Sequence, residues 1–188
     1  NLTRRPDLEP LRKGFALMLI TDFARIPGLM VVERVRLQAL VEEMNLGASK
    51  LTEPGTAVEL GNLLKARWFV GGDFSRGRKD LLSVRGTLLD IPIQKVIGRT
   101  DSKGVLEELF RLEKEILFET LTILEVTIPP EKRELLKMPM SKKTGALMAL
   151  FTGIAKSDAR DFPGAAISYQ KALTIDPDLT VAREALSE

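Results

Sequence analysis

Carboxylates are the side chains of this sequence best suited to acid–base chemistry, because the chain has no histidine and no cysteine. The commonest general base, cysteine nucleophiles, disulfides and thiolate metal sites are thereby excluded. Five glutamates lie close together, and their spacing is typical of the solvated face of a helix rather than of a facing acid–base pair. They are Glu107, Glu108, Glu113, Glu115 and Glu119. The sequence nominates no catalytic, metal-binding or cofactor-binding residue, and we expect a protein that is not an enzyme.

Asp22 and the adjacent pair Glu33-Arg34 are candidates for a buried polar site. Paired charges that are withdrawn from water are frequent at functional sites. The structural alternative is that Arg34 ties the end of a strand to a neighbouring helix. We favour this alternative because buried ion pairs commonly fix geometry rather than perform chemistry.

The glycines Gly71, Gly72 and Gly77 do not form a phosphate-binding loop, because no glycine motif here follows a strand and opens a helix. We predict that these glycines form a bulge or a hairpin. The one local basic cluster consists of Ser75, Arg76, Arg78 and Lys79. Contact with lipid headgroups or with an acidic partner is one interpretation of this cluster, and a solvated turn is the favoured one.

Composition and charge narrow the class of partner. The 28 basic and 26 acidic residues are interspersed and leave a net charge of +2, so nothing in the chain resembles an arm that grips nucleic acid. No apolar stretch approaches the roughly 20 residues of a membrane-spanning helix. We therefore expect no nucleic-acid partner, and membrane contact only through an anchor upstream of Asn1.

Hydrophobic periodicity predicts strands that alternate with helices in the first two thirds of the chain. The predicted helices cover Leu11 to Ile26, Leu37 to Met44, Thr56 to Leu64 and Gly104 to Glu125, and the predicted strands cover Leu29 to Val32, Trp68 to Val70, Asp80 to Asp90 and Pro92 to Arg99. The spacing of Thr56 and Glu59 predicts a capping box. The two-residue joint Ile91-Pro92 predicts an antiparallel hairpin.

Alternating elements followed by helices alone predict an α/β domain with a helical tail. The domain covers residues 1–126 and contains a mixed β-sheet flanked by helices. The pairs Pro129-Pro130 and Met138-Pro139 bracket a predicted linker over residues 127–143. A helical hairpin with a short capping helix follows over residues 144–188, with its two main helices at Thr144 to Ala159 and Pro163 to Ile175.

The stretch from Leu11 to Asp73 resembles the CsgG-like and TolB-amino-terminal-like family, part of the curli-assembly CsgG superfamily. The matching residues are, in chain order, Gly14, Leu19, Thr21, Asp22, Val32, Glu33, Arg34, Arg36, Leu37, Leu40, Glu43, Thr56, Ala57, Gly61, Leu63 and Ala66. The resemblance implies a fold like that of CsgG and anticodon-binding domains. It also implies that Asn1-Leu2-Thr3 is the tail of a first strand that lies upstream of Asn1.

Residues 144–188 resemble a single tetratricopeptide repeat (TPR), in which small residues let two antiparallel helices approach closely. The matching residues are Gly153, Ala165, Tyr169, Ala172 and Pro177. The resemblance implies a peptide groove lined by Ala149, Thr152 and Lys156, and the alternative is a docking hairpin without a ligand. Because one repeat rarely buries its own apolar faces, this hairpin should lean on the α/β domain, on further repeats or on a partner.

The family resemblance implies a non-enzymatic protein of the bacterial cell envelope. We expect an assembly or scaffold protein of the periplasm that binds other envelope proteins through its tail and its α/β domain. An upstream lipid could tether it to the outer membrane. A homo-oligomer is also compatible with this expectation. Two alternatives stay open: a subunit of a CsgG-type outer-membrane secretion complex, and a TolB-like ligand-sensing domain of a signalling protein. The single predicted hairpin, from Asp80 to Arg99, argues against the secretion complex.

Overall fold

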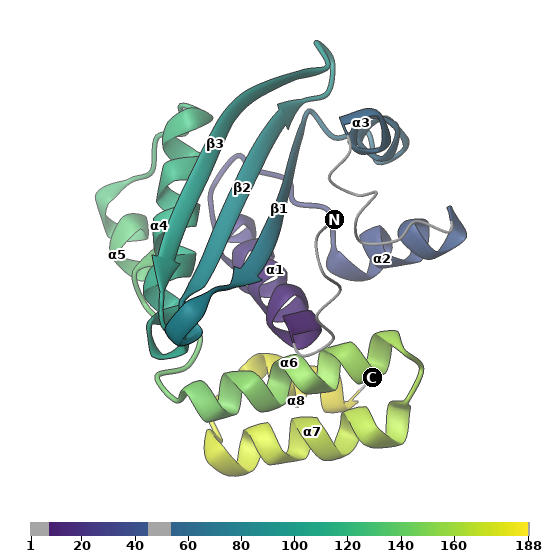
Figure 1. Ribbon diagram of the computed structural model, residues 1–188, viewed down its shortest axis with the longest axis vertical. Helices are drawn as coiled ribbons and strands as arrows, with labels where there is room; N and C mark the ends of the chain where they lie inside the picture. Colours follow the sequence, from purple (N-terminus) through teal and green to yellow (C-terminus); the bar gives the residue numbers. More distant parts are fainter. Residues whose placement is uncertain (1–7, 45–53, 188) are drawn as a thin grey trace.

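The computed structural model of the protein describes residues 8–44 and 54–187. The expected strand tail Asn1-Leu2-Thr3 lies outside the described residues. Within them, eight α-helices surround one three-stranded antiparallel sheet (Figure 1). The predicted combination of helices with a β-sheet is therefore confirmed.

The sheet has the strand order β1 (Trp68–Arg76), β2 (Leu82–Asp90), β3 (Lys95–Gly104). A short turn of 3-10 helix, η2 (Arg78–Asp80), joins β1 to β2. Leu88 pairs with Gly98 whereas Leu89 pairs with Val96, so Ile97 is an extra residue that forms a bulge in β3. The predicted β2–β3 hairpin is confirmed, but its connection is the four-residue turn 91–94 rather than the two-residue joint Ile91-Pro92.

Three sequence predictions are wrong: the strand at Leu29 to Val32, the mixed sheet, and the capping box at Thr56. Leu29 to Val32 forms a loop, and Met30 in it is fully exposed. A strand needs a neighbour to satisfy its backbone groups, and no strand of the described residues pairs with this segment, so the sheet is antiparallel throughout instead of mixed. The capping box at Thr56 is also absent. The helix begins two residues earlier, at Pro54, because proline suits the first helical position.

Helices α1 (Glu9–Ala24) and α4 (Leu109–Ile123) cover one face of the sheet, and the 3-10 turn η3 (Leu106–Glu108) leads into α4. Alternate residues of β2, among them Leu82 and Val84, share a core cluster with Phe15 of α1 and with Leu112 and Ile116 of α4. Leu89 belongs to the other set of alternate residues of β2 and points to the opposite side of the sheet. It packs with residues of α3 (Pro54–Leu63), which covers only the end of the sheet near the β2–β3 turn.

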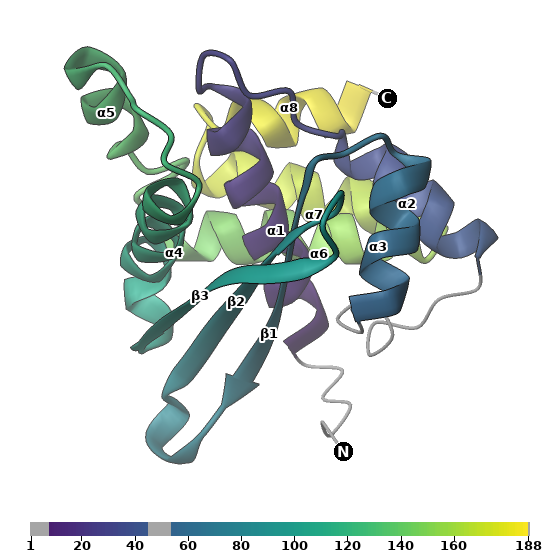
Figure 2. The ribbon, with the colours of Figure 1, turned by 90° about the horizontal axis from the view of Figure 1, so that it is seen from above.

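Two further helices lie at the periphery. Helix α2 (Arg34–Glu43) has no buried residue, and Figure 2 shows it with α3 on the side of α1 opposite to α4. Helix α5 (Pro130–Leu136) occupies part of the predicted linker and inserts Leu136 into a small core with Phe23, Ile26, Leu117 and Leu121. The connecting segment is therefore attached to the α/β body rather than extended.

The tail consists of α6 (Thr144–Asp158), α7 (Phe162–Ile175) and α8 (Thr180–Ser187), close to the predicted helices. Gly153 gives α7 a close approach to α6, because a Cβ there would overlap the ring of Tyr169. Gly14 does the same for α1 and α6, since a Cβ would overlap the ring of Phe151. One core cluster runs from the sheet through α1 into α6, α7 and α8, so the tail leans on the body as expected.

Candidate functional site

Helix α1 carries Asp22 into a buried charge cluster at its contact with α4. The Asp22 carboxylate is bound by Lys114 Nζ, and Arg25 Nη1 donates to Asp22 Oδ1 at 3.2 Å. Lys114 Nζ also lies 3.0 Å from Glu113 Oε2. The side chains of Asp22, Lys114 and Glu113 are 7%, 11% and 0% exposed, so the cluster is withdrawn from water. It contains two carboxylates and one buried ammonium.

Glu113 is the residue that the sequence interpretation placed wrongly. It was expected on the solvated face of the helix, and it is fully buried; among the described residues its carboxylate has the ion pair with Lys114 but no hydrogen bond of regular geometry. Its position between Leu109, Leu112 and Ile116 on the apolar stripe of the helix was the available signal. Burial raises the pKa of Glu113 to about 8; Lys114 opposes this rise and Asp22 adds to it.

A second buried cluster joins α1 and α2 to the end of α6. Arg34 donates from Nη2 and Nη1 to the two oxygens of Asp158 at 2.9 and 3.0 Å, and Lys13 Nζ lies 2.8 Å from Asp158 Oδ2. Burial alone would raise the pKa of Asp158, but the hydrogen bonds from Arg34 and Lys13 outweigh it and the pKa is lowered. In this cluster two cations, Arg34 and Lys13, pair with the single carboxylate of Asp158.

The structure does not bring Asp22 together with Glu33 and Arg34. Asp22 belongs to the α1–α4 contact, Arg34 belongs to the contact with α6, and Glu33 is exposed. The favoured interpretation of Arg34 as a structural tie is therefore supported, although its partner lies 124 residues away in the tail and not in a neighbouring helix of the body.

The three residues of the predicted peptide groove lie along α6. Ala149 is 7% exposed and belongs to the core that the tail shares with the body. The hydroxyl of Thr152 donates to the carbonyl of Met148, and Lys156 Nζ donates to the carbonyl of Gly164 at 3.3 Å. Only the half-buried Thr152 and Lys156 remain for a ligand, so the three do not line an open channel together.

Arg78 and Lys79 lie in the turn between β1 and β2, as favoured for the basic cluster, but the bulge or hairpin predicted at Gly71 and Gly72 is absent. Gly71 and Gly72 are regular residues of β1, and Gly77 begins the connection to β2. Arg76 Nε lies 3.0 Å from Asp80 Oδ1, so the cluster is partly neutralised by its own turn.

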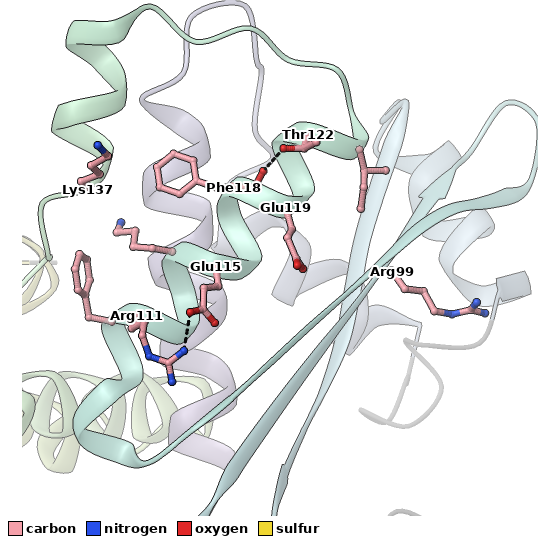
Figure 3. A pocket seen from close by; sticks show the side chains of 10 residues that line it. Arg99, Arg111, Glu115, Phe118, Glu119, Thr122 and Lys137 are labelled. Atoms are coloured by element: carbon pink, nitrogen blue, oxygen red, sulfur yellow. Dashed lines mark hydrogen bonds and ion pairs between the residues drawn. The ribbon is translucent and has the colours of Figure 1, made fainter.

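An open groove of about 770 Å³ follows the outer side of α4 between β3 and the end of α5 (Figure 3). The half-buried rings of Phe110 and Phe118 provide its apolar part, and each carries a cation above it. Lys114 Nζ lies 5.1 Å from the centre of the Phe110 ring, and the Arg133 guanidinium lies 4.7 Å from the centre of the Phe118 ring. Arg133 therefore borders the aromatic surface with an exposed positive charge, whereas Lys114 is neutralised by Asp22 and Glu113.

Arg111, one of the exposed charges of this groove, is satisfied by its neighbours. Arg111 binds Glu108 at 3.1 Å and Glu115 at 2.6 Å, and it also donates to the carbonyl of Lys103. Hydrogen bonds from Ser102 and Arg111 lower the pKa of Glu115, and those from Arg111 and the Val105 amide lower the pKa of Glu108. These carboxylates are thus fixed as anions. The arrangement suits recognition of a surface more than proton transfer.

No group of three or more histidine, cysteine, aspartate or glutamate side chains is placed to hold a metal ion in residues 8–44 and 54–187. In the same part of the chain, every helix is too short or too polar to cross a lipid bilayer.

Comparison with known proteins gives one match. Residues 9–75, from α1 to β1, match the family model of the curli production assembly/transport component CsgG. No curated protein matches the chain, and neither does any solved structure. This part of the protein is therefore CsgG-like, and the similarity of residues 144–188 to a tetratricopeptide repeat stays a prediction.

Proposed function

We propose that this protein is a non-enzymatic component of the bacterial cell envelope that supports assembly or scaffolding by binding other envelope proteins. The observation that carries the proposal is the match of residues 9–75 to the CsgG family model, whose description names an assembly and transport component. Periplasmic localisation belongs to the same proposal.

Two surfaces are available for a protein partner. The first is the groove along α4, where Phe110 and Phe118 offer apolar area beside cations. Aromatic side chains and arginine are enriched at protein interfaces. The second is the outer side of the tail, where Phe162 is 63% and Ile167 is 70% exposed. In our proposal the tail presents these side chains while α6 remains docked on α1.

Deleting the tail would be a poor test, because α6 shares a core with α1 and its removal would expose Phe15 and Met18. A sharper test leaves the fold intact. A photo-crosslinking residue is placed in the full-length protein at Ile167, at Phe118, or at Leu81, which is 43% exposed in the β1–β2 connection and serves as the control position.

The crosslinked adducts are then identified by mass spectrometry after separation of the cell into cytoplasmic and envelope fractions. We expect the protein in the envelope fraction and adducts with envelope proteins at Ile167 or Phe118 in excess of those at Leu81. A purely cytoplasmic protein would contradict the proposal, and so would adducts no more frequent at Ile167 and Phe118 than at Leu81. Turnover of a nucleotide or hydrolase substrate that a single substitution abolishes would contradict its non-enzymatic part.

A further inference from the structure

The end of the β2–β3 hairpin extends beyond α1 and α4, which cover one face of the rest of the sheet (Figure 1), and only its base at Ile91 is buried against α3. Lys95, Val96 and Ile97 are exposed in succession, although alternate residues of a strand normally face opposite sides. Neither face of β3 is therefore covered here. From Gly98 onwards α4 packs against the strand, because a Cβ at Gly98 would lie 2.6 Å from Ile123 of α4.

This hairpin end, which we define as residues 65–68 and 90–99, exposes a group of large apolar side chains. Ile93 is 57%, Val96 40% and Ile97 36% exposed. Trp68 belongs to the same end, since it pairs with Asp90 across the sheet, and the amide of Ile91 donates to the carbonyl of Arg67 at 2.9 Å. Adjacent exposed apolar side chains favour an environment other than water.

The hairpin end is also strongly basic. It carries Lys65, Arg67, Lys95 and Arg99 against a single acid, Asp90. Asp90 accepts a hydrogen bond from the amide of Ile93 and lies 4.0 Å from Arg67, whose guanidinium stacks 4.8 Å above the Trp68 ring. In the described part of the chain, Lys65, Lys95 and Arg99 have no acidic partner, and Figure 3 shows Arg99 pointing away from α4. Their positive charge is therefore available to a ligand.

We propose that the hairpin end docks on the surface of an anionic phospholipid bilayer. Ile93, Val96 and Ile97 enter the headgroup region, and the surrounding bases contact lipid phosphates. Apolar side chains inside a basic rim are the combination that binds anionic membrane surfaces, and tryptophan favours the same interface. This contact needs no anchor upstream of Asn1, and it goes beyond the proposed function, which concerns protein partners.

Shape and edge chemistry favour a bilayer over another protein. The centres of protein interfaces are depleted in lysine, whereas Lys95 lies between the exposed Ile93 and Val96. Pairing of β3 with a second copy is disfavoured by Lys95, Arg99 and Lys103 along this edge strand and by the bulge at Ile97. A fluid headgroup layer can instead close around a convex surface.

Trp68 provides a direct test, because it is the only tryptophan of the chain and lies at the proposed contact. The full chain is titrated with vesicles of phosphatidylcholine alone and with vesicles of equal parts phosphatidylcholine and phosphatidylglycerol. We expect a saturable blue shift of Trp68 emission and co-sedimentation with the anionic vesicles only. Binding should weaken as salt is added, because screening reduces the attraction of the bases to lipid phosphates.

Two double variants then locate the contact. Ile93→Ser with Lys95→Glu should lower the apparent vesicle affinity roughly tenfold or more, since it removes apolar area and reverses a charge. Ile167→Ser with Lys171→Glu makes the same changes at exposed positions of α7 and should leave the affinity unchanged. Circular dichroism and thermal unfolding verify that both variants are folded.

Three results would overturn the proposal. One is the absence of vesicle binding, and another is equal binding to neutral and anionic vesicles. The third is equal weakening in both double variants. Concentration-dependent self-association that the Ile93/Lys95 variant abolishes, in the absence of vesicle binding, would assign the surface to a second copy of the chain instead. Because the assay uses purified protein and lipid alone, its outcome is independent of the crosslinking experiment on protein partners.

Discussion

Helix α1 makes two contacts that differ in their charge balance. At the contact with α6, the carboxylate of Asp158 is surrounded by two cations, Arg34 and Lys13. At the contact with α4, the carboxylates of Asp22 and Glu113 share one buried ammonium, that of Lys114, and the exposed Arg25 adds a second cation at Asp22. Both clusters are buried, and both join segments that are distant in the sequence. The number of cations per carboxylate therefore distinguishes them.

This difference gives the two contacts opposite dependences on pH. The lowered pKa of Asp158 means that its contribution to stability is present above the pKa of an unfolded aspartate and is lost as the pH falls through the folded pKa. The pKa of Glu113 is raised from 4.5 to about 8, so its contribution is present below 4.5 and is lost as the pH rises from there to about 8. Acid weakens the first contact, and base weakens the second.

Removing the apolar part of the α1–α6 contact should have the largest effect. Phe151 is fully buried against Gly14, so Phe151→Ala should lower the free energy of unfolding by about 3–5 kcal/mol through lost burial and a cavity. Chemical denaturation of the full chain measures this change. The matched control is Phe162→Ala, at a ring that is 63% exposed, which should alter stability by less than about 0.5 kcal/mol.

A third variant separates packing from simple loss of hydrophobicity. Gly14→Ala should destabilise the protein in the wild-type background, because the added methyl group would overlap the Phe151 ring. The same change should be tolerated or stabilising when residue 151 is alanine, since alanine favours a helix over glycine by about 1 kcal/mol. Equal effects of Gly14→Ala in the two backgrounds would contradict the proposed close contact.

The sequence predicts the helical layout around these contacts well. The periodicity of α1, α4, α6 and α7 is local information, and so is the small-residue spacing that brings Gly153 against Tyr169. Whether a segment forms a strand depends less on its local sequence. Leu29 to Val32 has a strand composition yet forms a loop, because a strand also requires a partner whose position the local sequence does not contain.

The charged residues show the same limit. Arg34 was identifiable as a structural tie, but its partner Asp158 could not be predicted, because the contact depends on how α6 docks against α1. Glu113 was identifiable in principle, since it interrupts an apolar stripe, but the abundance of neighbouring glutamates favoured a solvated face. Sequence patterns thus locate charges on elements, and tertiary packing decides which of them meet.

Asp158→Asn should have the second largest effect on stability. The substitution keeps the shape of the side chain but leaves Arg34 and Lys13 without an anionic partner, at a site where the Asp158 side chain is only 5% exposed. We expect a loss of about 1–3 kcal/mol at neutral pH by chemical denaturation, less than for a fully buried pair because both cations remain about one fifth exposed.

The pH dependence of Asp158→Asn provides its own control. The difference between variant and wild type should shrink as the pH falls below 3.8, the ordinary pKa of aspartate, because the unfolded chain is protonated first and the folded chain follows only at lower pH. Asp101→Asn changes a carboxylate that is 50% exposed and paired with Lys103, and it should be close to neutral at every pH. A difference for Asp158→Asn that stays constant from neutral to acid pH would show that lost geometry, not lost charge, causes the destabilisation.

Glu113→Gln tests the other contact and should have the smallest effect, with the opposite sign. The amide removes the carboxylate whose ionisation burial opposes, while Asp22 keeps both of its cations, Lys114 and Arg25. We expect the variant to be about 1 kcal/mol more stable than wild type at about pH 9 and nearly equal to it at about pH 5. Glu119→Gln, on the exposed side of the same helix, should show no such trend.

If Glu113→Gln instead destabilised the protein more at about pH 9 than at about pH 5, the ionised Glu113 would be a net stabilising partner of Lys114. The charge count would then fail as the explanation for the difference between the two contacts of α1.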